Sequence, residues 1–508
     1  MRLRILPGVS LAALMIGFTV VPATAQKAAD HLRIVMGNAV NNVDPYYNSQ
    51  RSGLIIHHQV WDTLVHRDPE TFQLKPLLAS EWKVVDEKTI EFNLRPGVKF
   101  HDGSPLTADD VVYTINHVSH SESRVATPSN YNWIDKAEKT GDLGVRVHLK
   151  RPTPAALDYF ALVVPIYPKV YREKVGAEGY AKAPIGSGPY RLTKVDAGSL
   201  VEMERFEDYW AGSAKGTATI KKLSIRFVPD PATELTELLA GRADWIWNMS
   251  ADQFDNVNKM PGLLATRQES MRIGYLSIDA AGRSGAGNPL TNVKVRQAIF
   301  HALDRQTMAD KLITGGSRVP HAPCYPPQFG CDENAAVKYV YDPAKARQLL
   351  AEAGFPNGFE TELVSYNPPQ WTAAVQNYLQ AVGIKVKVSQ LQVAAAIQRA
   401  WKGENPLYFG SWGSYSINDV SANMPNFFTG GNDDYARDPE LKRYLEEGGS
   451  TNDPANRKVA YSAAIRIATE KAYWVPMFTF VTIYAHTKQL DFKPYPDELP
   501  RYYLAKWK

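Results

Sequence analysis

The residues best suited to chemistry in this chain are aromatic, amide and hydroxyl side chains that follow two predicted strands. One strand ends at Ser365 and the other near Trp412. The residues that follow are Tyr366, Asn367, Pro368 and Pro369 in the first case, and Gly413, Ser414, Tyr415, Ser416, Ile417, Asn418 and Asp419 in the second. Rings mixed with uncharged hydrogen-bonding groups favour the binding of a partly polar organic molecule.

Both groups stand where open α/β proteins place their ligands. Loops beyond the carboxyl ends of strands vary while the sheet stays rigid, so binding residues gather there. For Trp412 we favour ligand contact over core packing, because its neighbours Gly413, Ser414 and Ser416 are small and polar. For Tyr366 the two interpretations stay equally open.

Other aromatic residues are candidate walls of the same site. They are Tyr46 and Tyr47 after the first predicted strand, Trp245 and Trp247 on a later strand, and Tyr131, Asn132 and Trp133 after a proline. Alternate residues of a strand share one face, so we favour core packing for Trp247. The cluster around Trp133 fits a lid contact or a surface loop equally well.

No catalytic or metal-binding motif appears in the sequence. Gly186–Tyr190 is glycine-rich but leads into a predicted strand, so it lacks the helix N-terminus that binds phosphate. His57 and His58 are adjacent in a predicted helix and point about 100° apart, which disfavours a shared metal. No nucleophile elbow, zincin helix or Walker lysine is present. We therefore expect no enzymatic activity, no cofactor and no directly bound metal.

The elements that position these residues are of mixed α and β type throughout. The clearest is the stretch from Thr89 to Ile115, where Ile90, Phe92 and Leu94 alternate with polar residues and predict a strand. Proline and glycine then predict turns, and Thr107 with an acidic residue three positions later predicts a capped helix.

Within that stretch, "LRPGVKFHDGSPLTADDVVY" resembles the hallmark block of the peptide, nickel and opine class of ABC-importer binding proteins. Four further segments resemble the same family, in the same order: "GSGPYRL" (186–192), "AGRADW" (240–245), "VKVRQAIFHALDR" (293–305) and "YDPAKARQLLAEAGF" (341–355). The resemblance implies an α/β fold, a two-lobed periplasmic-binding-protein clamshell with an inserted α+β domain.

The strand and helix pattern, read with this resemblance, predicts three domains. Lobe I comprises residues 26–67, 196–274 and 485–508; residues 68–195 form inserted domain II; and residues 275–484 form lobe II. The chain length agrees with about two to four domains.

The resemblance also shows what this chain lacks. In relatives that bind dipeptides, an aspartate soon after the tryptophan pairs with the ligand's ammonium group, but residues 413–415 here are Gly-Ser-Tyr. Those relatives place an arginine for the ligand carboxylate before the Tyr-Asn-Pro element, where residues 364–365 here are Val-Ser. Burying an unpaired charge is costly, so a dipeptide held by both termini is not supported. Asp419 remains open as a replacement carboxylate or a surface cap.

The ends and the composition indicate an exported protein. Arg2 and Arg4 precede an apolar run over 9–21 and a small-residue cleavage site, so residues 1–25 are predicted to be a cleaved signal peptide. The run is shorter than the roughly 18 residues that span a bilayer, and we expect no membrane span.

The net charge of +4 is spread along the chain, which argues against nucleic-acid binding. Cys324 and Cys331 predict a disulfide in an oxidising compartment, with two free thiols as the alternative.

Together these features predict a soluble, monomeric periplasmic protein that captures a peptide-like or other polar organic solute and delivers it to an inner-membrane ABC permease. Opines, sugar conjugates and metal chelates are alternative ligands within the family, favoured by the two missing charge partners. From a different class, the alternative is a periplasmic chaperone or hydrolase. A hydrolase needs a nucleophile and base pair, which the sequence does not show, and a chaperone would bind unfolded chains.

Overall fold

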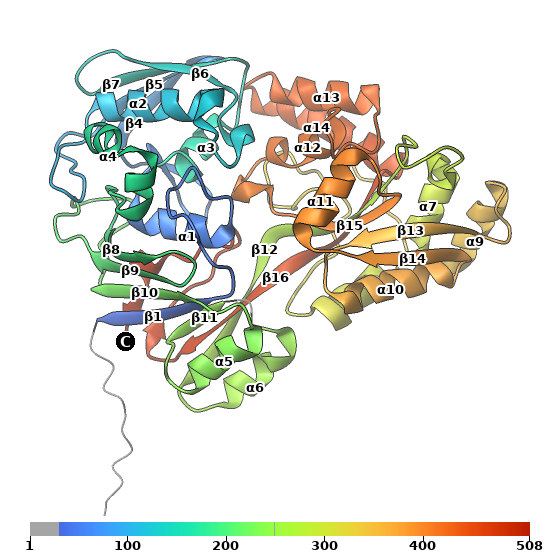
Figure 1. The fold of residues 1–508 in the computed structure, drawn as a ribbon. Helices are drawn as coiled ribbons and strands as arrows, with labels where there is room; N and C mark the ends of the chain where they lie inside the picture. Colours follow the sequence, from blue (N-terminus) through green and yellow to red (C-terminus); the bar gives the residue numbers. More distant parts are fainter. Residues whose placement is uncertain (1–29, 248) are drawn as a thin grey trace, which may run out of the picture.

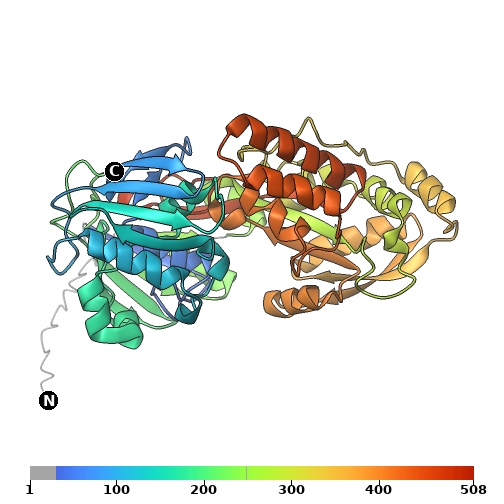
Figure 2. The ribbon, with the colours of Figure 1, turned by 90° about the horizontal axis from the view of Figure 1, so that it is seen from above.

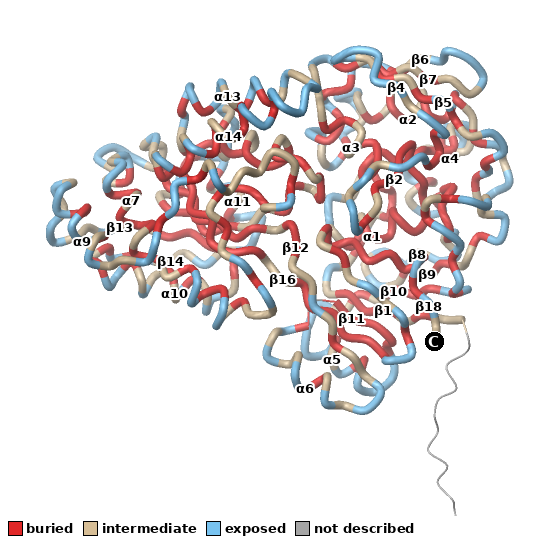
Figure 3. Tube along the Cα trace, turned by 180° about the vertical axis from the view of Figure 1, so that it is seen from behind, coloured by how far each residue is buried: buried red, intermediate tan, exposed pale blue. Residues whose placement is uncertain are grey.

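The computed structural model describes residues 30–247 and 249–508. The predicted signal peptide, residues 1–25, lies outside the described residues. The two halves of the molecule lie end to end along its long axis, as Figures 1 and 2 show from two directions. Buried segments fill the interior of both halves, whereas outer helices such as α6 (Phe254–Lys259) and α9 (Pro343–Glu352) carry exposed residues (Figure 3). The α/β clamshell expected from the sequence is confirmed by this arrangement and by the likeness to solved proteins described below.

Ten strands form one continuous sheet through both halves. In order across the sheet they are β14 (Ile384–Gln390), β13 (Phe359–Ser365), β15 (Leu407–Trp412), β12 (Leu263–Ile278), β16 (Trp474–Thr487), β11 (Trp245–Trp247), β1 (His31–Met36), β10 (Lys222–Phe227), β9 (Leu200–Arg205) and β8 (Tyr190–Asp196). The strand β11 pairs in parallel with the opening strand β1, as the strand-helix-strand pattern around it predicts.

The long strands β12 and β16 belong to both halves. Residues 263–269 of β12 pair with β16 in lobe I, and residues 273–278 lie between β16 and β15 in lobe II. The register shifts between Glu269 and Ile273, and the backbone N–H of Met271 bonds instead to the carbonyl of Pro496 at 2.8 Å. A bulge interrupts the ladder and bends the strand. We expect the hinge here, beside the predicted boundary at residue 275; the division into three domains stays a prediction.

The segment predicted as an inserted domain has its own antiparallel sheet. Its strands, in order, are β4 (Ala79–Asp86), β5 (Thr89–Leu94), β7 (Gly144–Leu149) and β6 (Ile134–Lys139). The capping box predicted for the following helix is present, since the Thr107 N–H donates to Asp110 Oδ2 at 2.8 Å. The core of this segment is continuous with that of lobe I, so the two pack as one body.

The helices cover the sheets on both sides. They are α1 (Arg51–Val60), α5 (Pro231–Leu239) and α6 in lobe I; α2 (Ala108–Ser119), α3 (Ala156–Leu162) and α4 (Lys169–Lys182) in the inserted segment; and α7 (Val293–Ala302), α8 (Arg305–Met308), α9, α10 (Pro369–Gln380), α11 (Val393–Lys402), α12 (Met424–Phe428), α13 (Pro439–Gly449) and α14 (Pro454–Glu470) in lobe II. The helical stretch of residues 293–313 is interrupted after α7, where the Asp304 side chain accepts from the Thr307 N–H and caps a new helix.

Four short strands form two further pairs. They are β2 (Val65–Arg67) paired with β3 (Leu74–Pro76), and β17 (Leu490–Asp491) paired with β18 (Lys506–Trp507). The glycine-rich turn before β8 packs directly against the end of α1. A Cβ at Gly186 would lie 2.0 Å from the Val60 carbonyl oxygen, which accepts a hydrogen bond from the Gly188 N–H at 2.9 Å. Close approach of two backbones therefore requires glycine there, and the predicted turn is present.

Cys324 and Cys331 are joined by a disulfide. We expect protein unfolded without reductant to show no reaction with a thiol reagent, and protein unfolded after reduction to show 2 thiols per chain, the full cysteine content. The double variant Cys324→Ser/Cys331→Ser is the control and should react in neither state. Thiols in the unreduced parent would contradict the bond.

Candidate ligand-binding cleft

The ends of β13 and β15 bring the two predicted polar groups together. The strands are parallel neighbours, so both end at the same edge of the sheet. The Tyr366 hydroxyl accepts from the Ser411 N–H at 2.7 Å, and the Asn367 side-chain amide donates to the Phe409 carbonyl at 3.1 Å. These bonds fix the end of β13 against β15.

A first cavity, of about 190 Å³, lies between α1, the inserted segment and the end of β15. Four residues predicted as candidates for the site line it, namely Tyr46, Tyr131, Trp412 and Tyr415. The other lining residues are Pro45, Asn48, Ser49, Gln50, Arg51, Leu54, His57, Thr127, Asn130, Val163, Arg272 and Gly413. Residues from both halves of the molecule therefore line one space.

Trp412 forms the lobe II wall of the first cavity. Its Nε1–H donates to the Ala422 carbonyl at 3.0 Å, and its ring packs edge-on against Tyr415 at 4.9 Å and Phe427 at 5.7 Å between centroids. The side chain is only partly buried. It therefore has a fixed orientation and still presents ring surface to the cavity.

The chain after Trp412 has an unusual backbone. Ser414, Tyr415 and Ser416 all have positive φ, at 50°, 49° and 64°. Left-handed backbone at residues other than glycine costs about 1–3 kcal/mol each and persists where neighbouring contacts enforce it. Here Ser416 Oγ donates to the Asp497 carbonyl at 2.7 Å, and Gln328, inside the disulfide loop, donates to the Ile417 carbonyl at 2.8 Å.

A second cavity, of about 860 Å³, lies on the other side of two shared arginines. Tyr366 and Asn367 line it, as does Trp247, for which core packing is the favoured interpretation from sequence. Its other lining residues are Asn38, Arg51, Met249, Ser250, Ala251, Asp252, Arg272, Lys311, Leu312, Ile313, Thr314, Pro368, Gln370, Trp371, Ser411, Phe480, Val481, Thr482, Ile483 and Glu498. Most of these side chains are apolar or uncharged.

Arg51 and Arg272 line both cavities, and no motif or spacing in the sequence marks them as site residues. Arg51 begins α1 in lobe I, whereas Arg272 lies at the bulge of β12. Both pair with the Glu498 Oε2 atom, at 3.3 Å for Arg51 and 3.2 Å for Arg272. Burial lowers the pKa of the Arg51 guanidinium, and Glu498 raises that of Arg272. Burial alone would raise the pKa of Glu498, but Arg272 and Arg51 together hold it below its ordinary value.

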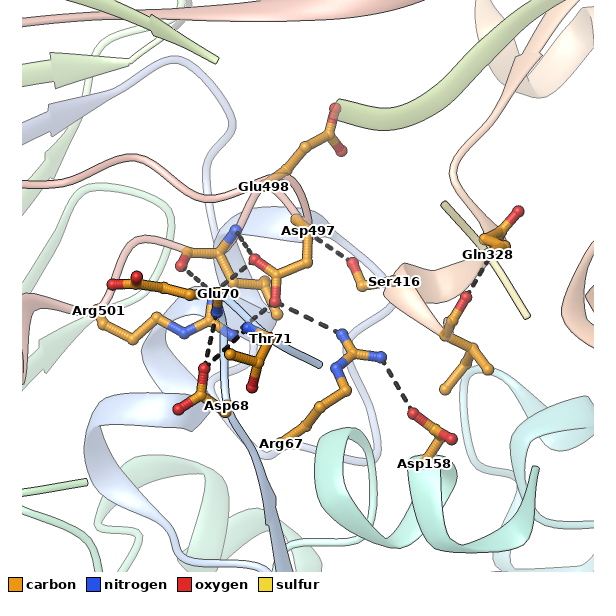
Figure 4. A network of polar contacts seen from close by, with 12 residues as sticks. Arg67, Asp68, Glu70, Thr71, Asp158, Gln328, Ser416, Asp497, Glu498 and Arg501 are labelled. Carbon is orange, nitrogen blue, oxygen red and sulfur yellow. Dashed lines mark hydrogen bonds and ion pairs between the residues drawn. The ribbon is translucent and has the colours of Figure 1, made fainter. Parts of the chain in front are cut away.

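The neighbouring Asp497 points the other way, into a buried ion network (Figure 4). It pairs with Arg501 at 2.5 Å and with Arg67 at 3.5 Å, and Arg67 reaches Asp158 of α3 at 3.3 Å. Burial opposes ionisation of Asp497, yet Arg501 and Arg67 lower its pKa. This segment therefore fastens the C-terminus, β2 and the inserted segment to one another beside the cleft.

Five predicted contacts do not line either cavity: Tyr47, Trp133, Trp245, Ser414 and Asn418. Trp245 is fully buried, with its ring 5.4 Å from Tyr484 and 5.3 Å from Tyr502, so it belongs to the core. Trp133 is also buried and donates to the Asn130 carbonyl at 2.8 Å. These aromatic rings face neighbouring elements, which sequence spacing does not reveal.

Asp419 is engaged within lobe II. Its Oδ1 atom pairs with Arg457 at 2.8 Å, both side chains are 6% exposed, and the same oxygen accepts from the Ser421 N–H at 2.9 Å. Of the two roles left open by the sequence, the cap agrees with this geometry, although the residue is buried. A ligand ammonium group would have to displace the arginine.

His57, which is buried and lines the first cavity, and His101, which is partly buried beside the glycine-rich turn, are neutral at pH 7. Burial lowers the pKa of His57 to about 3 and that of His101 to about 4. Among the described residues no group of three or more potential metal-binding side chains of His, Cys, Asp or Glu type converges. Nor is any helix in the described part of the chain long and apolar enough to cross a bilayer.

Comparison with known proteins agrees with this geometry. The family model described as "Bacterial extracellular solute-binding proteins, family 5 Middle" matches residues 73–435. The glutathione-binding protein GsiB of Shigella flexneri serotype 5b (strain 8401) is 26% identical over 497 residues, covering 93% of each chain. The structure of HbpA2 from Haemophilus parasuis superposes with a TM-score of 0.80 at 25% identity, covering 94% of this chain and 100% of that one. AgaA from A. tumefacien R10, in complex with agropinic acid, gives a TM-score of 0.77 at 24% identity, covering 94% and 99%, and shows likeness of fold.

The buried histidines predict acid sensitivity. Unfolded histidine binds a proton near pH 6.5, whereas folded His57 stays neutral down to about 3, so stability is complete above about pH 6.5 and falls as the pH drops. We expect His57→Gln to reduce this loss by about 1 kcal/mol per pH unit between about pH 6 and 5, measured by denaturant unfolding at each pH. The exposed His120, changed to Gln, is the control. A parent-like slope for His57→Gln would contradict the assignment.

Proposed function

The chain belongs to family 5 of the bacterial extracellular solute-binding proteins, and on this premise we propose that its cleft captures a small peptide-like solute for an inner-membrane ABC permease. The protein is the solute-binding component of an ABC importer. We propose that it acts in the periplasm, as a monomer and without chemistry on the solute. The observation that carries the ligand class is the pair of adjoining cavities with aromatic and amide walls.

The size and lining of the cleft favour a molecule of a few residues. Cavities that hold small organic ligands are typically about 300–1,000 Å³ with mostly apolar walls and a few placed polar groups. The two cavities share Arg51 and Arg272 in their walls, so a solute bound in either cavity lies beside this pair. GsiB is named for glutathione binding, which makes that tripeptide the first probe to use.

Capture by closure follows from the placement of the walls. Asn130 and Tyr131 come from the inserted segment, Arg51 from α1, and Trp412 from the end of β15. A solute that touches all of them binds the closed form better than an open one, so it shifts the population toward closure. The bulge in β12 supplies the flexible point.

Trp412→Ala tests the site directly. We expect binding of glutathione, measured by calorimetry, to weaken more than about tenfold, because one aromatic wall is removed. The melting temperature should fall by a few degrees, since the Trp412 contacts with Phe427 and Ala422 are also lost. The control is Trp401→Ala, a 45% exposed tryptophan of α11 outside both cavities.

Equal affinity in Trp412→Ala and the parent would remove Trp412 from the site. Native mass spectrometry of protein purified without refolding gives an independent check, because a solute retained in the cleft appears as added mass. A retained solute with no peptide-like group would contradict the proposed ligand class.

A further inference from the structure

The arginine pair belongs to a network with more positive than negative charge. The ion pairs join Arg51, Arg67, Arg272 and Arg501 to Asp158, Asp497 and Glu498. Four guanidinium groups therefore face three carboxylates, which leaves one positive charge in excess. A charge that is poorly solvated and unpaired is costly, so a further anion stabilises this network.

The excess charge faces the cavities. The side chains of Arg272 and Arg51 are 28% and 14% exposed, whereas those of Arg67 and Arg501 are 0% and 1% exposed. None of the described residues that line the first cavity is acidic. The second cavity adds the cation Lys311 to the arginine pair and holds Asp252 and Glu498, so its charges also sum to a positive value.

Several buried polar atoms in the same walls have no partner within the described part of the protein. They are His57 Nε2 and Asn130 Oδ1 in the first cavity and Trp247 Nε1 in the second. These three residues are 6%, 5% and 5% exposed. These atoms have almost no accessible surface in this conformation, so a solute reaches them only after the walls move, and the attraction for an anion comes from the arginine pair.

The arginine pair has donors for an anion. Arg272 uses Nε and Nη2 on Glu498, while its Nη1 makes only a long contact of 3.5 Å to Ser411 Oγ. A Cβ at Gly413 would lie 3.1 Å from Arg272 Nη2 and 3.5 Å from Arg51 Nη2, so glycine at this position lets both guanidinium groups approach the chain after β15. Planar guanidinium groups match the two oxygens of a carboxylate.

We propose that Arg51 and Arg272 form an anion subsite that selects solutes with a carboxylate, which shares the pair with Glu498 and balances the excess charge. This inference rests on the proposed function and names the charge class of its solute. The subsite lies on α1 and β12 and is next to Gly413, so its two cations stand beside the stretch after Trp412 where dipeptide-binding relatives keep an aspartate.

Paired probes test the inference. A panel of short peptides that includes glutathione is titrated by calorimetry, each peptide both as the free acid and with its carboxylates converted to amides. We expect each amide to bind about tenfold or more weakly than its acid, because the charge-assisted hydrogen bonds are lost. Acids and amides that bind equally would overturn the subsite and leave solute capture itself intact. A protein that binds no member of the panel would contradict both.

Two substitutions with opposite expected effects sharpen the test. Arg272→Gln should weaken binding of the acids about tenfold and abolish most of the preference for acid over amide. Glu498→Gln keeps a hydrogen-bond acceptor but removes the competing charge, so it should strengthen binding of the acids about threefold or more. The control is Arg267→Gln, an exposed arginine of the same strand that lines neither cavity.

A purely structural role for the arginines predicts that all these variants weaken acids and amides alike, and that result would overturn the proposal. Weaker binding of the acids by Glu498→Gln would also overturn it. If Arg272→Gln does not fold, the parent's acid and amide comparison and the Glu498→Gln titration still decide the question.

Discussion

Two adjacent carboxylates, Asp497 and Glu498, hold the centre of this molecule together. Asp497 fastens Arg67 and Arg501, while Glu498 receives Arg51 and Arg272. Removing one partner from such a network leaves the other charge buried without a counter-charge. The free-energy cost of that change is far larger than the net stabilisation that the pair provides. Backbone carbonyls of this segment also accept hydrogen bonds. The Asp497 carbonyl accepts from Ser416 Oγ, and the Pro496 carbonyl accepts from the Met271 N–H at the bulge of β12. The cleft walls therefore depend on a few residues near the C-terminus.

The same constraint explains the strained loop after β15. Three consecutive residues with positive φ are unfavourable on their own, yet Ser416 is bonded to the Asp497 carbonyl and Ile417 to the disulfide loop. These hydrogen bonds hold the Tyr415 ring edge-on against the Trp412 ring in the cavity wall. Long-range contacts therefore maintain backbone strain in the wall of a cavity that both lobes line. Such strain is expected at a site that must be preorganised for binding.

The hinge that we expect lies at a wall of the cleft, because Arg272 is at the bulge of β12 and lines both cavities. The sheet is continuous through both lobes, so we expect bending at the irregular pairing of β12 with β16. The inserted segment shares its core with lobe I, and the two therefore carry Asn130, Tyr131 and Arg51 as one unit. Lobe II carries Trp412 and Tyr415 as the opposing unit. In the closure that we propose, a solute between the two units links a local contact to a movement of the whole molecule.

The features that depend on near neighbours could be predicted from the sequence. The strand, turn and capped helix from Thr89 follow from alternation and capping, and the contact of Tyr366 with Ser411 follows from two strands that end at one sheet edge. Which rings reach the cleft depends on folding, because Trp245 and Trp133 have the same local patterns as exposed aromatics but pack against distant elements. Folding also brought residues 51, 272 and 498 together. The spacing of these residues in the sequence does not predict their contact. The net charge of a cleft is summed over residues that become neighbours only when the chain folds.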